Sequence, residues 1–414
     1  MQNTRYQIQD TKYQPPELLC PAGNWASLRA AVENGADSVY FGVKGVNMRH
    51  FANNFDPLEI AKVMEYLREN NKKGYLALNV VVKNDELEKI RKILEEAKRA
   101  NVDAVILWDM AVFAIAKELG LKIHLSTQAS VSNKEALRFF ARLGAKRVVL
   151  ARECTLSDIR DILAAIKDED LGCEIETFIH GAMCVSISGR CFLSYYSHGK
   201  SANRGECLQP CRREYVVKDK EETVEYLLGD DYVLSPKDLC VMDFIDTLIE
   251  SGIHSFKIEG RMRSPEYLKV VTSCYRQAID AFFDGNLTAE LKQELQAKLA
   301  TVYNRGFSTG FYFGQPQDAY SRENEHLYEK MFVGEVTRFF KKISVAEVKL
   351  RSADLMKGQQ LLFIGKSTAA PTMTVEEMQK ENAFVEKAEK GDVIGLKVPF
   401  VVKPRDKVFL WRKK

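Results

Sequence analysis

The chain has 414 residues, of which 46% are hydrophobic, so it can bury a large core and should form two or three domains. Its formal net charge of +3 is too small to indicate a partner by itself. The first sixteen residues are polar and no apolar run approaches the roughly 18 residues of a membrane span, so we expect a cytoplasmic protein with no membrane partner.

Short β-rich runs alternate with amphipathic helical stretches. Eight strands are predicted, at residues 18–21, 38–42, 74–80, 104–108, 123–126, 147–150, 174–179 and 255–258. Helices are predicted at residues 24–34, 57–70, 85–99, 134–143, 156–166 and 241–250, and a last one begins at Ser264-Pro265. Such alternation implies parallel strands, and eight units within about 260 residues have the size of an α/β fold of the (β/α)8 TIM-like barrel type, here residues 1–285. A doubly wound open sheet is the alternative, but no dinucleotide-binding glycine fingerprint follows the first strand.

The polarity of alternate strand residues supports a closed barrel. On a barrel strand, successive side chains face the surrounding helices and the lumen in turn. Apolar residues take one parity here, and the polar residues on the lumen parity are Asn79, His124, Ser126, Glu176, His180, Lys257, Glu259 and Arg261. Several lie near the carboxyl ends of strands, where barrel enzymes hold their chemistry, although such residues can also serve only as buried ion pairs.

Residues 181–240 are predicted to form a cysteine-rich insertion after the seventh strand, at the catalytic mouth of the barrel. Five of the nine cysteines lie there: Cys184, Cys191, Cys207, Cys211 and Cys240. In a reducing cytosol, clustered cysteines are more often metal ligands or catalytic thiols than disulfides. Their spacing matches neither a zinc ribbon nor the ferredoxin run, so zinc, an iron–sulfur cluster and free thiols all remain open.

The C-terminal part of the chain has a different pattern. Residues 286–330 are predicted to be a connector, with a charged helix at 288–303 followed by a Gly- and aromatic-rich loop. Residues 331–414 are predicted to form a small β-barrel, with strands at 333–338, 344–350, 360–364, 383–387, 393–396 and 407–411. This domain has 17 Lys and Arg residues against 10 Asp and Glu residues, a surplus that suits either an RNA backbone or a solvated charged face.

Several motifs in the first 320 residues resemble one known family. The run from Glu176 contains His180-Gly181-Ala182, Cys184, Gly189 and Cys191. Further matches are E-L-L-C-P-A-G-N from Glu17, A-D-S-V-Y-F-G from Ala36, S-A-N-R-G-E-C-L-Q-P-C-R from Ser201 and F-K-I-E-G-R-M-R-S from Phe256. Together they resemble the signature of the U-32 peptidase family, the collagenase-like proteases. The C-terminal region also fits the small β-barrel appended to many members.

Within that family the sequence is most similar to the tRNA hydroxylation proteins. The resemblance implies hydroxylation of the tRNA wobble uridine to 5-hydroxyuridine without O2, with prephenate as hydroxyl donor; relatives act on ribosomal RNA or on a quinone precursor. It also implies a 4Fe-4S iron–sulfur cluster on Cys184, Cys191, Cys207 and Cys240, with Cys211 as the alternative to Cys207. It leaves open whether a paralogous partner subunit or a homo-oligomer is needed.

The family name raises proteolysis as the alternative function. The sequence has no His-Glu-x-x-His helix, no Gly-x-Ser-x-Gly elbow and no obvious paired-aspartate motif. A thiol protease built on Cys184 and His180 is conceivable, but four clustered cysteines fit it poorly.

For hydroxylation, the candidate residues are polar side chains expected at the barrel mouth. Those for substrate binding are Lys257, Arg261, Arg152 and Asn79, because fixed cations would pair the carboxylates of prephenate. Those for proton transfer are His180, His124 and Glu259, since histidine titrates near neutral pH.

Overall fold

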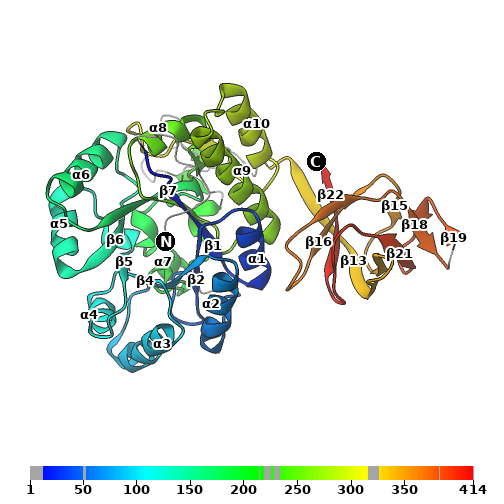
Figure 1. Cartoon of the computed structure of the whole chain (residues 1–414), viewed down its shortest axis with the longest axis horizontal. Helices are drawn as coiled ribbons and strands as arrows, with labels where there is room; N and C mark the ends of the chain where they lie inside the picture. Colours follow the sequence, from blue (N-terminus) through cyan, green and yellow to red (C-terminus); the bar gives the residue numbers. More distant parts are fainter. Residues whose placement is uncertain are drawn as a thin grey trace.

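The computed structural model describes residues 13–49, 53–213, 215–218, 225–227, 234–315, 326–381 and 383–413. A ring of parallel strands surrounded by helices forms its larger part, and an antiparallel sheet domain forms its smaller part (Figure 1). Both parts correspond to the predicted fold class.

The barrel strands follow one another around the ring in chain order. They are β1 (Glu17–Ala22), β2 (Ser38–Gly42), β3 (Lys73–Leu78), β4 (Ala104–Leu107), β5 (Ile123–Leu125), β6 (Ala145–Val149), β7 (Glu174–Gly181) and β11 (Ser255–Ile258). Each pairs in parallel with the next, and β11 pairs with both β7 and β1, which closes the ring. The predicted barrel is confirmed, and the open sheet is wrong.

Helices cover the outside of the ring (Figure 1). They are α1 (Trp25–Glu33), α2 (Ile60–Glu69), α3 (Leu87–Arg99), α4 (Met110–Glu118), α5 (Lys134–Leu143), α6 (Leu156–Asp168), α8 (Ile245–Glu250), α9 (Pro265–Phe283) and α10 (Ala289–Leu299). Asn24 caps α1 by accepting a hydrogen bond from the Ser27 amide, and Pro265 takes the first position of α9, as predicted. The sequence does not predict α4, because its mostly apolar residues lack a clear polar face. Among the described residues, no helix has the length and apolar character needed to span a bilayer.

The lumen contains a small apolar layer of its own. It consists of Leu19, Tyr40, Tyr75, Ala77, Ala104 and Ile106, apart from the main core between strands and helices. Because Tyr75 and Ala77 point inward while Leu76 and Leu78 join the outer core, the side-chain parity predicted for β3 is confirmed.

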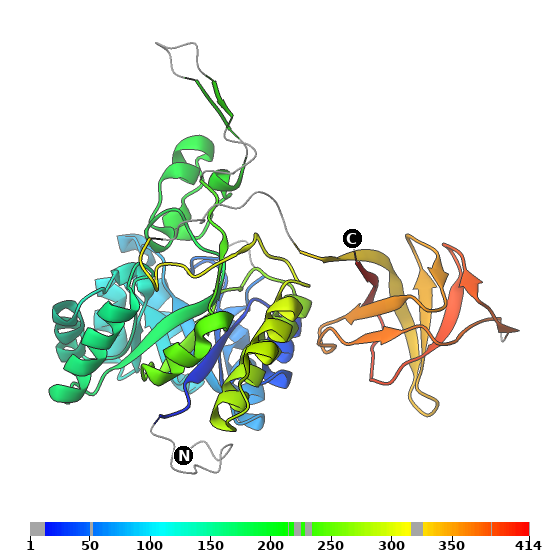
Figure 2. The ribbon, with the colours of Figure 1, turned by 90° about the horizontal axis from the view of Figure 1, so that it is seen from above.

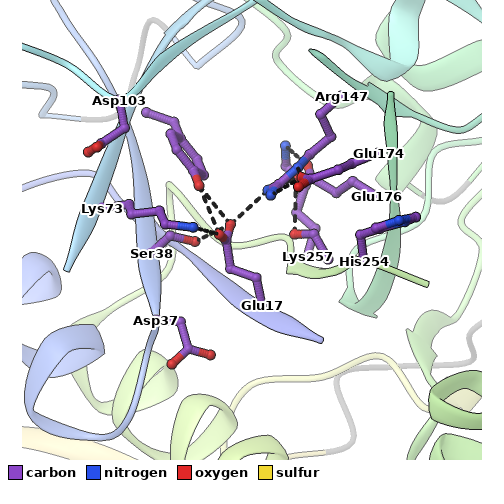
Figure 3. A network of polar contacts seen from close by, with 12 residues as sticks. Glu17, Asp37, Ser38, Lys73, Asp103, Arg147, Glu174, Glu176, His254 and Lys257 are labelled. Carbon is purple, nitrogen blue, oxygen red and sulfur yellow. Dashed lines mark hydrogen bonds and ion pairs between the residues drawn. The ribbon is translucent and has the colours of Figure 1, made fainter. Parts of the chain in front are cut away.

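Charged side chains fill the amino-terminal end of the lumen (Figure 3). Glu17 accepts hydrogen bonds from Lys73 Nζ at 2.8 Å and from Arg147 Nη1 at 2.7 Å. Arg147 also lies 3.3 Å from Glu176, whose other oxygen is 2.8 Å from Lys257 Nζ. Buried charges are stable when they are paired in this way. This network closes the lower end of the barrel and leaves the polar residues of the upper end to form a site.

The insertion after β7 stands over the carboxyl ends of the barrel strands (Figure 2). It contains α7 (Leu193–His198), the paired strands β8 (Val216–Lys218) and β9 (Glu225–Leu227), and β10 (Asp238–Cys240). β10 pairs antiparallel with the end of β7, so both ends of the insertion are fixed to one strand. The connector strand β12 (Phe307–Ser308) pairs with β10, which brings the connector to the barrel mouth.

The C-terminal domain is a curled antiparallel sheet with its own apolar core. Its strands are β13 (Tyr328–Phe340), β14 (Val345–Leu350), β16 (Gln360–Ile364), β17 (Thr372–Thr374), β18 (Met378–Lys380), β19 (Ala383–Phe384), β21 (Val393–Lys397) and β22 (Lys407–Lys413). Two further strands, β15 (Leu355–Met356) and β20 (Lys387–Ala388), pair separately. The strand predicted at 383–387 is therefore two short strands, because the chain passes from one sheet to the other between them.

The two parts of the molecule meet along α9. Lys330 Nζ lies 2.5 Å from a Glu266 carboxylate oxygen, and Lys269 Nζ donates to the Ala370 carbonyl at 3.3 Å. Trp411 packs against the core of the barrel. An ion pair, a hydrogen bond and an apolar contact thus join the β-domain to the barrel.

Candidate active site

A cavity of about 390 Å³ opens at the carboxyl ends of the barrel strands, beneath the insertion. The predicted site residues that line it are Asn79, Arg152, Cys184, Cys191, Cys207, Lys257, Glu259 and Arg261. They come from distant parts of the chain and meet at the end of the barrel where barrel enzymes hold their chemistry.

Four thiols line this cavity: Cys184, Cys191, Cys207 and Cys211. Cys240, which the resemblance places in the ligand set, lies outside the cavity wall. It is buried against α9, with its Sγ 3.6 Å from the Tyr275 hydroxyl, because β10 carries it along the outer side of β7. The structure thus brings Cys211, expected as the alternative to Cys207, together with Cys184, Cys191 and Cys207 and does not place Cys240 beside them, while the ligand set itself stays a prediction.

The loop that carries the thiols is held by polar contacts. The Cys191 amide donates to Asn203 Oδ1 at 3.1 Å. The Leu208 amide donates to the hydroxyl of Ser194, on the buried side of α7, at 3.0 Å. These bonds tie the segment of Cys191 and Ser194 to the segment that runs from Asn203 to Leu208.

Two glycines make close approaches that the cavity requires. Gly181, at the end of β7, has a φ of +107°, and a Cβ there would lie 2.5 Å from the Glu259 carbonyl oxygen. A Cβ on Gly42 would lie 2.5 Å from an Arg261 guanidinium nitrogen. A larger residue at either position would displace a segment of the cavity wall, which gives these positions of the family motifs a steric reason.

The surroundings of Cys184 favour its thiolate form. Burial acts to raise its pKa, but hydrogen bonds from Ser186 and the charge of Arg152 bring the pKa below its ordinary value. For Cys207 and Cys211, burial raises the pKa. Since metal binding requires thiolates, a bound metal would have to supply the charge that deprotonates these two.

The four cavity thiols are donors of the kind that hold zinc or an iron–sulfur cluster. Within the described residues, no three His, Cys, Asp or Glu side chains surround a common point as one metal ion would need. A four-iron cluster is held by four cysteine thiolates, each at a different iron, so its ligands stand further apart. The four cavity thiols supply the number of thiolates that such a cluster uses, and that they hold one stays a prediction.

Positive charge dominates the cavity wall. Its cations are Arg49, Arg152, Arg212, Lys257, Arg261, Arg263 and Arg305, and Glu259 is its one carboxylate among the described residues. Arg49 Nη2 lies 2.9 Å from Glu259 Oε1. Burial acts to raise the pKa of Glu259, but Arg49, Arg152 and Arg261 lower it to about 2. Glu259 is therefore ionised at neutral pH and is a weak proton acceptor.

Two guanidinium groups of the cavity wall, the half-buried Arg152 and the buried Arg261, have no carboxylate within ion-pair distance in the described part of the chain. Arg152 lies 4.1 Å over the Phe178 ring and donates to the Ala182 carbonyl at 2.6 Å, and its Nε has no hydrogen-bond acceptor there. Arg261 donates to Asn47 Oδ1 at 3.0 Å, and burial lowers its pKa to about 10. Because a buried unpaired charge is unfavourable, these groups indicate an anionic occupant of the cavity.

Lys257 belongs both to the cavity and to the network below it. Its Nζ lies 2.8 Å from Glu176 Oε1 and 4.5 Å from the centre of the Tyr40 ring. Glu176 already neutralises this lysine, so an anionic ligand would have to compete for it. Arg152 and Arg261 are therefore the stronger anion-binding candidates.

Neither predicted histidine lines the cavity. His124 faces the lumen as predicted, but it packs at 4.6 Å against the Tyr75 ring, and burial lowers its pKa well below the usual value. The lumen orientation predicted for His180 is wrong: its Nδ1 lies 3.2 Å from the Tyr275 hydroxyl on α9. The extra residue Ile179 forms a bulge opposite β11 and turns His180 outward. The structure thus does not bring His180 and Cys184 together as a protease pair.

The buried His180 predicts a pH-dependent stability. Burial and the charge of Arg263 lower its pKa to about 3, whereas an unfolded histidine has a pKa of about 6.5. Between these values the unfolded chain binds more protons, so stability falls as the pH decreases from 6.5 towards 3. We expect His180→Asn to flatten that slope by up to about 1.4 kcal/mol per pH unit, measured by urea unfolding across this range. Equal slopes in both proteins would contradict the burial of a neutral histidine.

Some residues that line the cavity were not among the site residues predicted from the sequence. They are Tyr40, Arg49, Phe178, Arg212, Arg263 and Arg305. Arg263 stands in the F-K-I-E-G-R-M-R-S motif, and Arg49 follows a strand end as Arg152 does, so position past a strand could have found both. Arg305 reaches the site through the pairing of β12 with β10, which no local pattern reveals.

Cysteines and unpaired arginines at the mouth of a parallel barrel define a candidate enzyme with an anionic ligand. The chain matches the model of peptidase family U32 over residues 23–322 and belongs to that family. It is 40% identical over 411 residues to a collagenase of Porphyromonas gingivalis, covering 96% of this chain and 98% of that protein. It is 35% identical over 375 residues to tRNA hydroxylation protein P1 of Bacillus subtilis, covering 89% and 87%. It is also 38% identical over 269 residues to the 23S rRNA 5-hydroxycytidine C2501 synthase of Escherichia coli, covering 65% of this chain and 40% of that protein.

Proposed function

We propose that the protein is an RNA-modifying enzyme that hydroxylates the tRNA wobble uridine to 5-hydroxyuridine, with prephenate as hydroxyl donor and without O2. The observation that carries the proposal is the cavity, where buried, unpaired arginines lie beside four thiols. Two relatives named for RNA hydroxylation support the choice of substrate class.

The donor would occupy the cationic half of the cavity. Prephenate has two carboxylates, and Arg152 and Arg261 offer guanidinium groups that can bind carboxylates in a bidentate manner. Asn79 adds an amide to the same wall. Glu259 is the one candidate for proton transfer that reaches the cavity, and its pairing with Arg49 also fixes that arginine.

We further propose that Cys184, Cys191, Cys207 and Cys211 hold a 4Fe-4S cluster, which would supply one-electron redox chemistry when bound. The protein places a cation beside the ligands at two points. Arg152 lowers the pKa of Cys184, and the charge of Arg212 acts in the same direction on Cys211. Arg212 is itself oriented by hydrogen bonds of 2.7 Å to the Ser235 hydroxyl and the Pro236 carbonyl.

A deletion strain provides the test. We expect its tRNA to lack 5-hydroxyuridine in nucleoside mass spectrometry, and wild-type protein to restore it. Arg152→Gln and Arg261→Gln should restore less than about a tenth, since losing a charged hydrogen bond to a buried carboxylate costs about 1.5–3 kcal/mol. The control is Arg138→Gln on α5, a half-buried arginine far from the cavity lining that pairs with Glu135 and Glu169 and should restore modification fully.

Unchanged 5-hydroxyuridine in the deletion strain would contradict the proposal, and loss of hydroxycytidine from ribosomal RNA would instead indicate ribosomal RNA as the substrate.

Peptide hydrolysis is the second candidate, favoured by the identity to a collagenase. Against it, no histidine of the described residues lines the cavity beside Cys184. Gelatin cleavage by pure protein, abolished by Cys184→Ser, would establish it. RNA binding by the surplus of Lys and Arg residues in the C-terminal domain stays a prediction.

A further inference from the structure

The outer face of α7 exposes large aromatic side chains. Phe192, Tyr195 and Tyr196 have exposed fractions of 64%, 54% and 85%. Their spacing of three and four residues places them on one side of a helical turn. Ser194 points the other way and is buried, with its hydroxyl accepting a hydrogen bond from the Leu208 amide. The helix is thus anchored through its inner side, and on its outer side Phe192 and Tyr196 contact each other edge to face, with 6.2 Å between their ring centroids, while all three rings stay exposed.

This aromatic face adjoins the cavity. α7 begins two residues after the cavity thiol Cys191, and the Leu193 amide donates to Cys191 Sγ at 3.3 Å. In Figure 1 the helix lies in projection inside the ring of strands, and in Figure 2 it stands above their carboxyl ends. The three rings do not line the cavity themselves, but the turn that carries them also contributes Leu193 and Ser194 to its wall.

The charges around α7 suit an anionic partner. Residues 184–213 contain five Lys and Arg residues and one acidic residue, Glu206. Arg190 and Lys200 are exposed and lie within four residues of the aromatic face in the chain. The wall of the adjoining cavity is also mainly positively charged. Cations alternating with exposed rings match a nucleic acid strand, which offers phosphates outside and flat bases within reach of the rings.

We propose that Phe192, Tyr195 and Tyr196 form a stacking surface for unpaired bases of an RNA strand whose target nucleotide enters the cavity. The inference rests on the proposed function, because it takes RNA as the substrate of this cavity, and it adds that the strand is single-stranded where it is bound. In a duplex the base faces are already covered by their neighbours, so rings at the mouth can stack only on unpaired bases.

Binding of fluorescently labelled oligouridine, followed by anisotropy, tests the surface. We expect the double variant Phe192→Ala with Tyr196→Ala to weaken binding by roughly tenfold or more, since each base stack contributes enough for that factor. Tyr196→Trp should bind like wild type, because it keeps a stacking ring. Binding of a duplex RNA of equal length should not change in any variant.

The matched control is Phe139→Ala, which removes a similarly exposed ring, 58% exposed, from α5 on the flank of the barrel. It should bind oligouridine like wild type. Equal affinity of the double variant and wild type would overturn the inference. So would a double variant that changes only the oligomeric state in light scattering, which would make the face a contact between copies. Wild-type protein that binds no RNA would overturn the proposed function as well. A double variant that restores tRNA modification in the deletion strain and binds oligouridine as tightly as wild type would overturn this inference alone.

Discussion

Protein carrying Cys211→Ser, purified without oxygen, is expected to lose its iron–sulfur cluster, whereas Cys240→Ala is expected to keep it. Wild-type protein should be brown and contain about four iron and four sulfide per chain. The reason is geometric: Cys211 lines the cavity with Cys184, Cys191 and Cys207, while Cys240 is buried against Tyr275 on the other side of β7. Iron and sulfide analysis and the visible absorbance of each variant would measure this.

Cys240→Ala is the matched control, since it removes a thiol at a fully buried position without creating a charge. Loss of iron from Cys240→Ala together with full iron in Cys211→Ser would show that the grouping in the cavity is not the ligand set. Stoichiometric zinc and no iron in anaerobic wild-type protein would contradict the cluster itself. Both outcomes are distinguishable from misfolding by the far-ultraviolet circular dichroism of each variant.

Replacing Glu176 by alanine is expected to lower the free energy of unfolding by about 3–5 kcal/mol, because it leaves the buried Lys257 without its carboxylate partner and removes one of the carboxylates around Arg147. Glu176 is 0% exposed and lies 2.8 Å from Lys257 and 3.3 Å from Arg147. Ser255 also donates to it at 3.2 Å. Urea unfolding at neutral pH would measure the change.

The control for Glu176 is Glu118→Ala, which breaks the exposed pair with Arg91 and should change stability little, since exposed pairs are screened by water. A double variant, Glu176→Met with Lys257→Met, should recover much of the loss, because it removes both charges and leaves apolar groups. A loss for Glu176→Ala as small as that for Glu118→Ala would show that the lumen is more hydrated than its burial indicates.

The barrel and part of its site could be predicted from the alternation of polar and apolar residues along the strands. Strand residues alternate between two faces, so the polar residues of β11 and its continuation, Lys257, Glu259 and Arg261, could be placed on the cavity side without knowing any contact. The same rule failed at the end of β7. A bulge adds one residue at Ile179 and reverses the parity of His180, and bulges depend on the register of the neighbouring strand rather than on local sequence.

The choice among the cysteines depended on long-range structure in the same way. Spacing alone could not show which of the five cysteines line the cavity, because β10 pairs with β7 across the 56 residues between them, and that pairing carries Cys240 away from the mouth. The unpaired state of Arg152 and Arg261 is likewise a property of the assembled wall. A sequence shows which residues carry charge but not which charges remain without partners.

The ion-pair network at the amino ends of the strands has a consequence for the order of events in a catalytic cycle. Glu17, Arg147 and Glu176 close the lower end of the barrel. Ligands therefore enter the cavity beneath the insertion, on the side where the RNA is proposed to bind. In the proposed function, a small donor enters before the RNA covers the entrance, and its remnant leaves after the RNA dissociates. The proposed function therefore predicts a compulsory-order mechanism, in which excess RNA inhibits by occupying the empty enzyme first.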